Sequence, residues 1–156
     1  MCLEKVLQFA TMMSARANLA IRLAPPPSAD RKAVLVDLSR KAHYSGNPVH
    51  KRNPGDFGLV PPSAPRPSKS LCDAAGIFNR VDATRLLREG IRRGTVSVQE
   101  EEGGWPRVVW AVTEDGLILE ARSDRSPLGS YHGYPLAPGN PMEKDVTHRW
   151  KEAENG

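Results

Sequence analysis

From residue 95 onward, helical spacing gives way to short stretches that either alternate or are rich in β-branched and aromatic residues, and this change constrains the fold more than any other feature of the chain. TVSVQEE (95–101), RVVWAVT (107–113), LILEARS (117–123) and SYHGYPL (130–136) are each typical of a short strand. EDG at 114–116 is a hairpin signal. The sequence therefore predicts a meander of three or four antiparallel strands.

Helical patterns flank these strands on both sides. Residues 79–93 form the clearest predicted helix, with Asn79 or Asp82 as its cap and Gly94 as its end. Its apolar stripe is Ala83, Leu86, Leu87 and Ile91. A second helix is expected over about residues 29–42, capped by Ser28 or Asp30, although AVLVDL within it also fits a strand. A short helix is expected over 140–150, with Asn140 as its cap.

The first 28 residues are expected to be a helical extension, because residues 3–22 are loosely amphipathic and APPPS (24–28) ends the pattern. Residues 29–152 are then a single α+β domain with its helices on one face of the sheet. No apolar run reaches the roughly 18 residues of a spanning helix, and the order of a signal peptide is missing. We expect a cytoplasmic protein with no membrane partner, started at Met1, Met12 or Met13.

A long proline- and glycine-rich loop joins the helices over residues 44–70. Loops of more than about 15 residues are usually functional or disordered. Phe57, Leu59 and Val60 favour an ordered loop that packs on the domain, and a solvated connector is the alternative. GNPVHKRNPGDFG within it fits either a phosphate-binding loop or simple turns.

Charge and cysteine content narrow the chemistry only mildly. The net charge of +4 permits a nucleic-acid partner without requiring one. Cys2 and Cys72 make no disulfide framework and no zinc-binding spacing, and we expect no cofactor and no metal. Cys72 fits either a buried apolar residue or a nucleophile activated near Lys69 and a helix start.

Histidines are the best candidates for catalysis. In metal-free RNA cleavage, one group takes the 2′-hydroxyl proton, another protonates the leaving 5′-oxygen, and a cation holds the phosphate. His50 and His132 are the predicted acid–base pair, and Lys51, Arg52 or Lys69 is the cation, with Lys51 preferred. The alternative is that each histidine is a structural loop residue.

Further residues are expected to bind the substrate through charge or base stacking. They are His43, Arg52, Lys69, Arg85, Arg88, Tyr131 and Tyr134. The bland alternative for the arginines is a solvated helix surface, and Trp110 is expected in the core because Val109 and Ala111 flank it in an alternating strand.

Four phrases, HYSGNPVHKRNPGDFG, SLCDAAG, WPRVVWAVTEDG and YHGYPL, resemble those of a family of small uncharacterised bacterial proteins over about residues 43–136. That resemblance implies no activity. The order of helices followed by an antiparallel sheet is also similar to the barnase-like ribonuclease toxins, in architecture only. It implies an endoribonuclease with RNA as its partner and an inhibitor protein as a further one. The alternative is a non-catalytic module that binds nucleic acid or protein.

Overall fold

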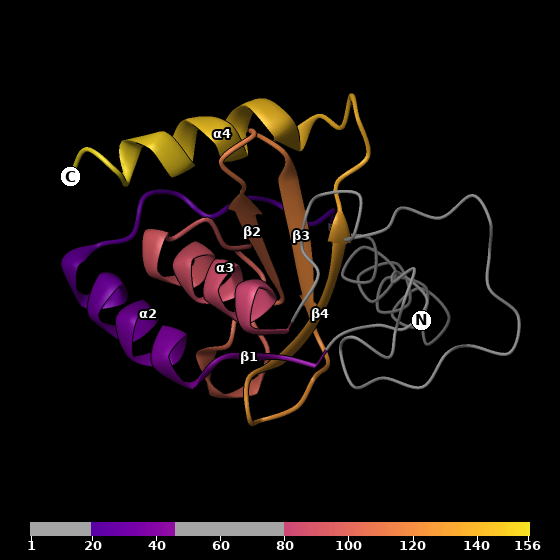
Figure 1. Ribbon diagram of the computed structural model, residues 1–156. Coiled ribbons are helices and arrows are strands. Elements are labelled where there is room, and N and C mark those ends of the chain that lie inside the picture. The colour runs from indigo at the N-terminus through magenta and orange to yellow at the C-terminus, as the bar shows by residue number, and fades with distance from the viewer. Residues whose placement is uncertain (1–19, 46–79) are drawn as a thin grey trace, which may run out of the picture.

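The computed structural model describes residues 20–45 and 80–156, in which three α-helices pack around a four-stranded sheet (Figure 1). The helices are α2 (Ala29–Lys41), α3 (Arg80–Arg93) and α4 (Met142–Glu152), and η4 (Glu102–Gly104) is a short 3-10 turn. The strands are β1 (His43–Tyr44), β2 (Val108–Val112), β3 (Ile118–Ser123) and β4 (Ser130–Pro135). The predicted α+β class is confirmed.

The sheet has the order β1-β4-β3-β2 and is mixed. β2, β3 and β4 form the predicted antiparallel meander, and a turn with Gly116 at φ 82° joins β2 to β3. β1 pairs with β4 in parallel, with Tyr44 opposite Tyr131, so the purely antiparallel prediction was wrong. Two residues are too few to show a period of two, which is why the sequence did not reveal β1.

The segment 95–101 is bridged to the sheet without forming the predicted strand. Val96 makes an isolated bridge to Val109, and Ser97 makes one to Leu23. The side chain of Ser97 also takes part in the pairing, because its hydroxyl oxygen accepts a bond from the Val108 amide at 2.9 Å. A side chain thus replaces part of a regular ladder here.

All three described helices end or begin as local chemistry predicts. The Ser28 hydroxyl accepts a bond from the Arg31 amide at 3.2 Å and starts α2, so the helical interpretation of AVLVDL is confirmed. α3 ends at Gly94, whose φ of 75° suits glycine. The Asn140 side chain accepts from the Met142 amide at 2.9 Å and starts α4.

Apolar side chains cover the sheet on both faces, not on one as predicted. On the first face, Leu35 of α2 and Leu87 and Ile91 of α3 pack against the sheet, in the cluster that includes Val109 and Tyr131. On the other face, α4 contributes the buried Val146. Its partners there are Val108, Trp110 and Ile118, with Ile21 and Leu23 beside them. VVWA of β2 is buried at every position, which is the reason a strand of this kind needs cover on both faces.

Residues 20–28 belong to the packed fold rather than to a separate helix. Residues 20–22 are not helical, and the Ala24 amide donates to the carbonyl of Val96 at 2.8 Å. The rest of the predicted N-terminal helix and most of the predicted 44–70 loop lie outside the described residues. Within the described parts of the chain, no helix is long and apolar enough to cross a membrane.

Candidate functional site

One part of the second sheet face carries polar side chains where its apolar cover ends. Cross-strand register places Glu120 opposite Tyr134, and Arg122 opposite His132. Because alternate residues of a strand share a face, these four lie on the same side as Trp110. The side chain of Arg122 is 47% exposed and that of His132 is 30% exposed. We call Glu120, Arg122, His132 and Tyr134 the sheet cluster.

Asp124 holds the His132 ring from the loop that follows β3. Its Oδ1 lies 2.5 Å from Nδ1 of His132, and its Oδ2 accepts hydrogen bonds from the hydroxyls of Ser45 and Ser130, each at 2.6 Å. A carboxylate only accepts, so Nδ1 carries the proton and Nε2 is the nitrogen left for proton exchange. Nε2 has no hydrogen-bond partner among the described residues. Both serines bond to the aspartate, so this is not a Ser–His–Asp triad.

The Asp124 carboxyl is held in its ionised form. Burial by itself would raise its pKa, but hydrogen bonds from Ser130, Ser45 and His132 together lower the pKa below the ordinary 3.8. The anion therefore persists at neutral pH and can stabilise a positive charge that forms on the His132 ring.

Trp105 packs against the loop that carries Asp124 and fixes its position. The Trp105 indole Nε1 donates to the carbonyl of Pro127 at 3.3 Å, and Gly129 approaches the same ring so closely that a side chain at position 129 would collide with it. Gly129 also has a φ of 75°, which favours glycine. Trp105 is itself buried and meets Tyr131 edge to face at 6.4 Å between ring centroids. The position of Asp124 thus depends on the core.

Glu120 organises the other half of the sheet cluster. Its Oε1 accepts from the Tyr134 hydroxyl at 2.8 Å and from the Arg122 guanidinium at 2.9 Å, and its Oε2 accepts from Nε1 of Trp110 at 3.1 Å. Nε of Arg122 also donates to the Tyr134 hydroxyl at 2.8 Å. A buried carboxylate needs such donors, and here they fix the directions of both Arg122 and Tyr134.

These contacts determine the charge states in the sheet cluster. Burial alone would lower the pKa of Arg122, but Glu120 and Tyr134 raise it on balance, so the guanidinium stays a cation. Burial, followed by the contact with Glu120, raises the pKa of Tyr134, which therefore stays a neutral hydroxyl. The surface offers a fixed cation beside an imidazole.

Tyr131 lies on the opposite face of the sheet, in the core, whereas His43 lies on the same face as the sheet cluster. Tyr131 is 0% exposed, burial raises its pKa, and its hydroxyl donates to the carbonyl of Pro106 at 2.6 Å. It is therefore a core residue, and its predicted contact with a base does not fit this position. His43 is exposed on β1, where it pairs with Ser130.

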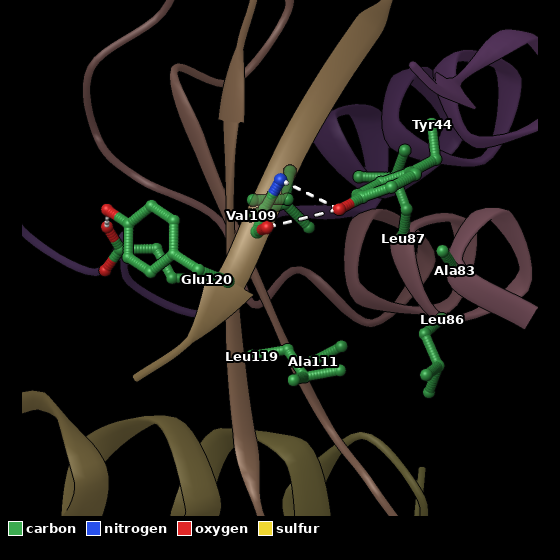
Figure 2. A pocket seen from close by; sticks show the side chains of 11 residues that line it. Tyr44, Ala83, Leu86, Leu87, Val109, Ala111, Leu119 and Glu120 are labelled. Atoms are coloured by element: carbon green, nitrogen blue, oxygen red, sulfur yellow. Dashed lines mark hydrogen bonds between the residues drawn. The ribbon is translucent and has the colours of Figure 1, made fainter. Parts of the chain in front are cut away.

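An apolar pocket lies between α3 and the opposite face of the sheet (Figure 2). Its volume is about 30 Å³, which is too small for a substrate. Tyr44 borders it, and its hydroxyl donates to the carbonyl of Gly133 at 3.1 Å and accepts from the Gly133 amide at 3.2 Å. Figure 2 shows the Glu120 side chain on the far side of the strands from Tyr44 and Leu87. Glu120 and Tyr134 of the sheet cluster are among the residues that line the pocket, but Arg122 and His132 are not.

Arg85 and Arg88 line a groove of about 690 Å³ between α2 and α3. Three more arginines line the same groove, namely Arg40, Arg80 and Arg92. Glu89 also lines it. We call this the arginine groove. α2 contributes Arg40 to this groove, so the basic surface is wider than the arginines of α3 alone indicated.

Four of the predicted site residues, His50, Lys51, Arg52 and Lys69, lie outside the described residues, as does Cys72. The pairing of His50 with His132 stays a prediction. Within residues 20–45 and 80–156, no group of three or more His, Cys, Asp or Glu side chains could hold a metal ion.

Sequence reasoning found His132 and Tyr134 but missed their partners. Glu120 and Arg122 stand two apart in LILEARS, inside a strand, and charged residues at alternate strand positions share a face. Because LILEARS is typical of a strand, that spacing indicates that the two side chains lie on the same face of the sheet. Asp124 stands two positions further on, just past the end of β3, where its amide donates to the carbonyl of Ser130 at 3.0 Å, so the same spacing extends to it.

The comparisons with other proteins add no relative to these observations. The architectural similarity to ribonuclease toxins therefore stays a prediction. No protein-family model, no curated protein and no solved structure matched the chain.

Proposed function

We propose that this protein cleaves RNA without a metal ion, with His132 transferring a proton and Arg122 holding the phosphate. The observation that carries this proposal is the pairing of Arg122 with His132 on adjacent strands. Directly opposite residues have Cβ atoms about 4.5–5.5 Å apart, so both side chains can reach one phosphodiester. Each is held by a carboxylate of its own, Glu120 for the arginine and Asp124 for the histidine.

The reaction is an internal transfer at phosphorus. The ribose 2′-oxygen loses its proton to a base and forms a bond to phosphorus, the bond to the 5′-oxygen breaks, and an acid protonates that oxygen. The products are a 2′,3′-cyclic phosphate and a free 5′-hydroxyl. Nε2 of His132 serves one of the two proton transfers, and Asp124 stabilises the imidazolium when Nε2 is protonated.

Arg122 and Tyr134 are the other described residues to which we assign contacts with the phosphate. A guanidinium next to the phosphate stabilises the charge that builds up on its oxygens. Arg122 is directed by Glu120, and the Tyr134 hydroxyl lies close enough to Arg122 to contact the same phosphate. His50 as the second proton-transfer group and Lys51 as a further cation remain predictions on residues outside the described ones.

A non-catalytic module that binds nucleic acid or protein is the second candidate. The arginine groove favours it, since a basic groove needs no catalytic histidine in order to bind. The two candidates differ in one respect: only the enzyme requires His132.

The first test compares His132→Ala with the wild type in an RNA digestion that contains a metal chelator. We expect the rate to fall by about 10²–10⁴, the usual contribution of an acid–base group. The fold should survive, because the His132 side chain is partly exposed and its main contact is with one carboxylate. Circular dichroism checks the fold.

The matched control is His148→Ala. His148 lies on α4 with its side chain 77% exposed and also contacts a carboxylate, that of Glu152 at 3.2 Å. Its loss should leave cleavage unchanged. Equal cleavage by folded His132→Ala and the wild type would contradict the proposal, and a wild type that cleaves no RNA would leave the binding module as the better account.

A further inference from the structure

We infer that the arginine groove binds the phosphate backbone of single-stranded RNA and leads the strand toward His132. This inference rests on the proposed function for the direction of the strand, and it adds a binding site on the helical side of the molecule. Both helices that form the groove, α2 and α3, lie next to each other at one side of the sheet (Figure 1).

Charge is the first argument. Five arginines and one glutamate line the groove, a formal charge of +4 that equals the net charge of the whole chain. The single carboxylate, Glu89, is already paired with Arg92 at 2.5 Å and with Arg93 at 2.7 Å. The field of the groove is therefore positive, and it attracts a polyanion.

The arginines of the groove differ in how firmly the fold holds their side chains. Arg40 and Arg85 are exposed and make no hydrogen bond or ion pair with any described residue. Arg88, in contrast, donates from Nε to the carbonyl of Ala42 at 2.9 Å, which fixes its stem and leaves the end of the guanidinium to the groove. The arginine groove thus contains one guanidinium that a hydrogen bond positions, that of Arg88, and two that can adapt their orientation to a ligand, those of Arg40 and Arg85.

Arginine chemistry favours phosphate as the ligand. The planar fork of a guanidinium donates two parallel bonds to a phosphate, and it stacks on flat rings such as bases. Val81, also on the groove, is 77% exposed and offers an apolar contact to a base. Unstacked bases of a single strand can use such contacts, whereas bases inside a duplex cannot.

Continuity with the sheet cluster is the third argument. Nη2 of Arg80 lies 3.5 Å from the carbonyl oxygen of Ser45. The hydroxyl of the same Ser45 donates to Asp124, which holds His132. One end of the groove is therefore two side chains away from the proposed catalytic histidine. A strand that follows the groove arrives at the site where it would be cut.

The test uses the double variant Arg40→Ala/Arg85→Ala and a short oligoribonucleotide that is 2′-O-methylated, so that binding is measured without cleavage. Fluorescence anisotropy over a series of salt concentrations gives the affinity and its salt dependence. We expect affinity to fall about tenfold. The slope of log affinity against log salt should decrease by about 1.4, since each phosphate contact contributes about 0.7 for a single strand.

The matched control is Lys144→Ala/Lys151→Ala, which removes the same charge from exposed positions on α4 and should change neither quantity. A folded Arg40→Ala/Arg85→Ala variant that binds as the wild type does would overturn the inference. A wild type that does not bind the oligoribonucleotide would also overturn it. So would a wild type that binds poly-glutamate instead of the oligoribonucleotide and loses that binding in the Arg40→Ala/Arg85→Ala variant. Arg40→Gln/Arg85→Gln repeats the test with longer side chains if the alanine variant fails to fold.

A dinucleoside phosphate separates this inference from the proposed function. It is too short to occupy the groove, so its cleavage depends on the sheet cluster alone. Its cleavage by the wild type reports on the sheet cluster, whereas affinity for the oligoribonucleotide reports on the groove. If the wild type cleaves neither the dinucleoside phosphate nor unmodified RNA while Arg40→Ala/Arg85→Ala still loses affinity, the catalytic proposal fails and the groove remains a binding site.

Discussion

Asp124 is the residue on which the candidate site depends most. It connects the loop after β3 to His132 of β4 and, through Ser45, to the chain that follows β1. Three donors converge on one carboxylate, and their hydrogen bonds favour its ionised form. A group of this kind couples the geometry of the site to pH.

We predict that Asp124→Asn destabilises the protein at pH 7 and that this difference shrinks in acid. The folded-state pKa of Asp124 is lowered, so its stabilising effect is complete above the unfolded value of 3.8. The effect is lost as pH falls through the lower folded-state pKa. Urea unfolding of both proteins at pH 7 and at two values below 4 measures this difference.

Asp145→Asn is the control for this experiment, because Asp145 is exposed on α4 and no described residue pairs with it. Its stability should stay parallel to that of the wild type at every pH. A difference between Asp124→Asn and the wild type that is constant or grows in acid would mean that Asp124 is not held as an anion.

Among the elements, α3 determines how closely helix and sheet approach. Gly90 of α3 lies against β2, where an added Cβ would be 2.8 Å from Cγ1 of Val109 and closer still to the carbonyl oxygen of Trp110. The backbone of a central strand cannot move aside easily. The glycine therefore brings the helix that carries the arginines close to the sheet that carries His132.

We predict that Gly90→Ala lowers the free energy of unfolding by about 1–3 kcal/mol, the usual cost of overpacking. Helix propensity alone predicts the opposite, a gain of up to about 1 kcal/mol for alanine over glycine. The sign of the change therefore decides which effect dominates. Urea denaturation measures it, and Gly90→Val should lose more. A stabilised Gly90→Ala would refute the close approach.

The sequence predicted most elements because their signals are local. The stripe of Ala83, Leu87 and Ile91 predicted α3, and the β-branched run around Trp110 predicted β2. β1 was missed because its pairing depends on a contact between residues 86 apart, as between Ser45 and Tyr131. The prediction of a strand over residues 95–101 was wrong, because an alternating pattern cannot show that the side chain of Ser97, rather than a backbone carbonyl, accepts the hydrogen bond from the Val108 amide.

At the scale of the whole molecule, the two candidate surfaces meet at one edge of the sheet. The sheet cluster faces one way and the arginine groove lies beside α3, and the segment around Ser45 connects them. β1, which directly precedes Ser45, is tied to β4 through the Tyr44 hydroxyl and the backbone of Gly133. In our proposal, binding and cleavage act on one strand of RNA.

The candidate site was predictable only in part, for a reason of the same scale. The side chains of histidine and arginine are suited to proton transfer and to phosphate binding whatever their surroundings, so His132, Arg85 and Arg88 could be named as candidates from the sequence. Their partners Asp124 and Arg40 come from other elements, and no local pattern links them. Tyr131 was misplaced because its neighbour Tyr134 shares its residue type but not its face of the sheet.

The most direct test of the central claim is the chemistry of the RNA ends. The wild-type protein is incubated with RNA in the presence of a metal chelator, and the fragments are analysed for their termini. We predict 2′,3′-cyclic phosphates with 5′-hydroxyls, and no cut on the 3′ side of a deoxyribose, which has no 2′-hydroxyl. Fragments with 5′-phosphates, or cuts on the 3′ side of a deoxyribose, would contradict the proposed internal transfer at phosphorus, in which His132 transfers a proton.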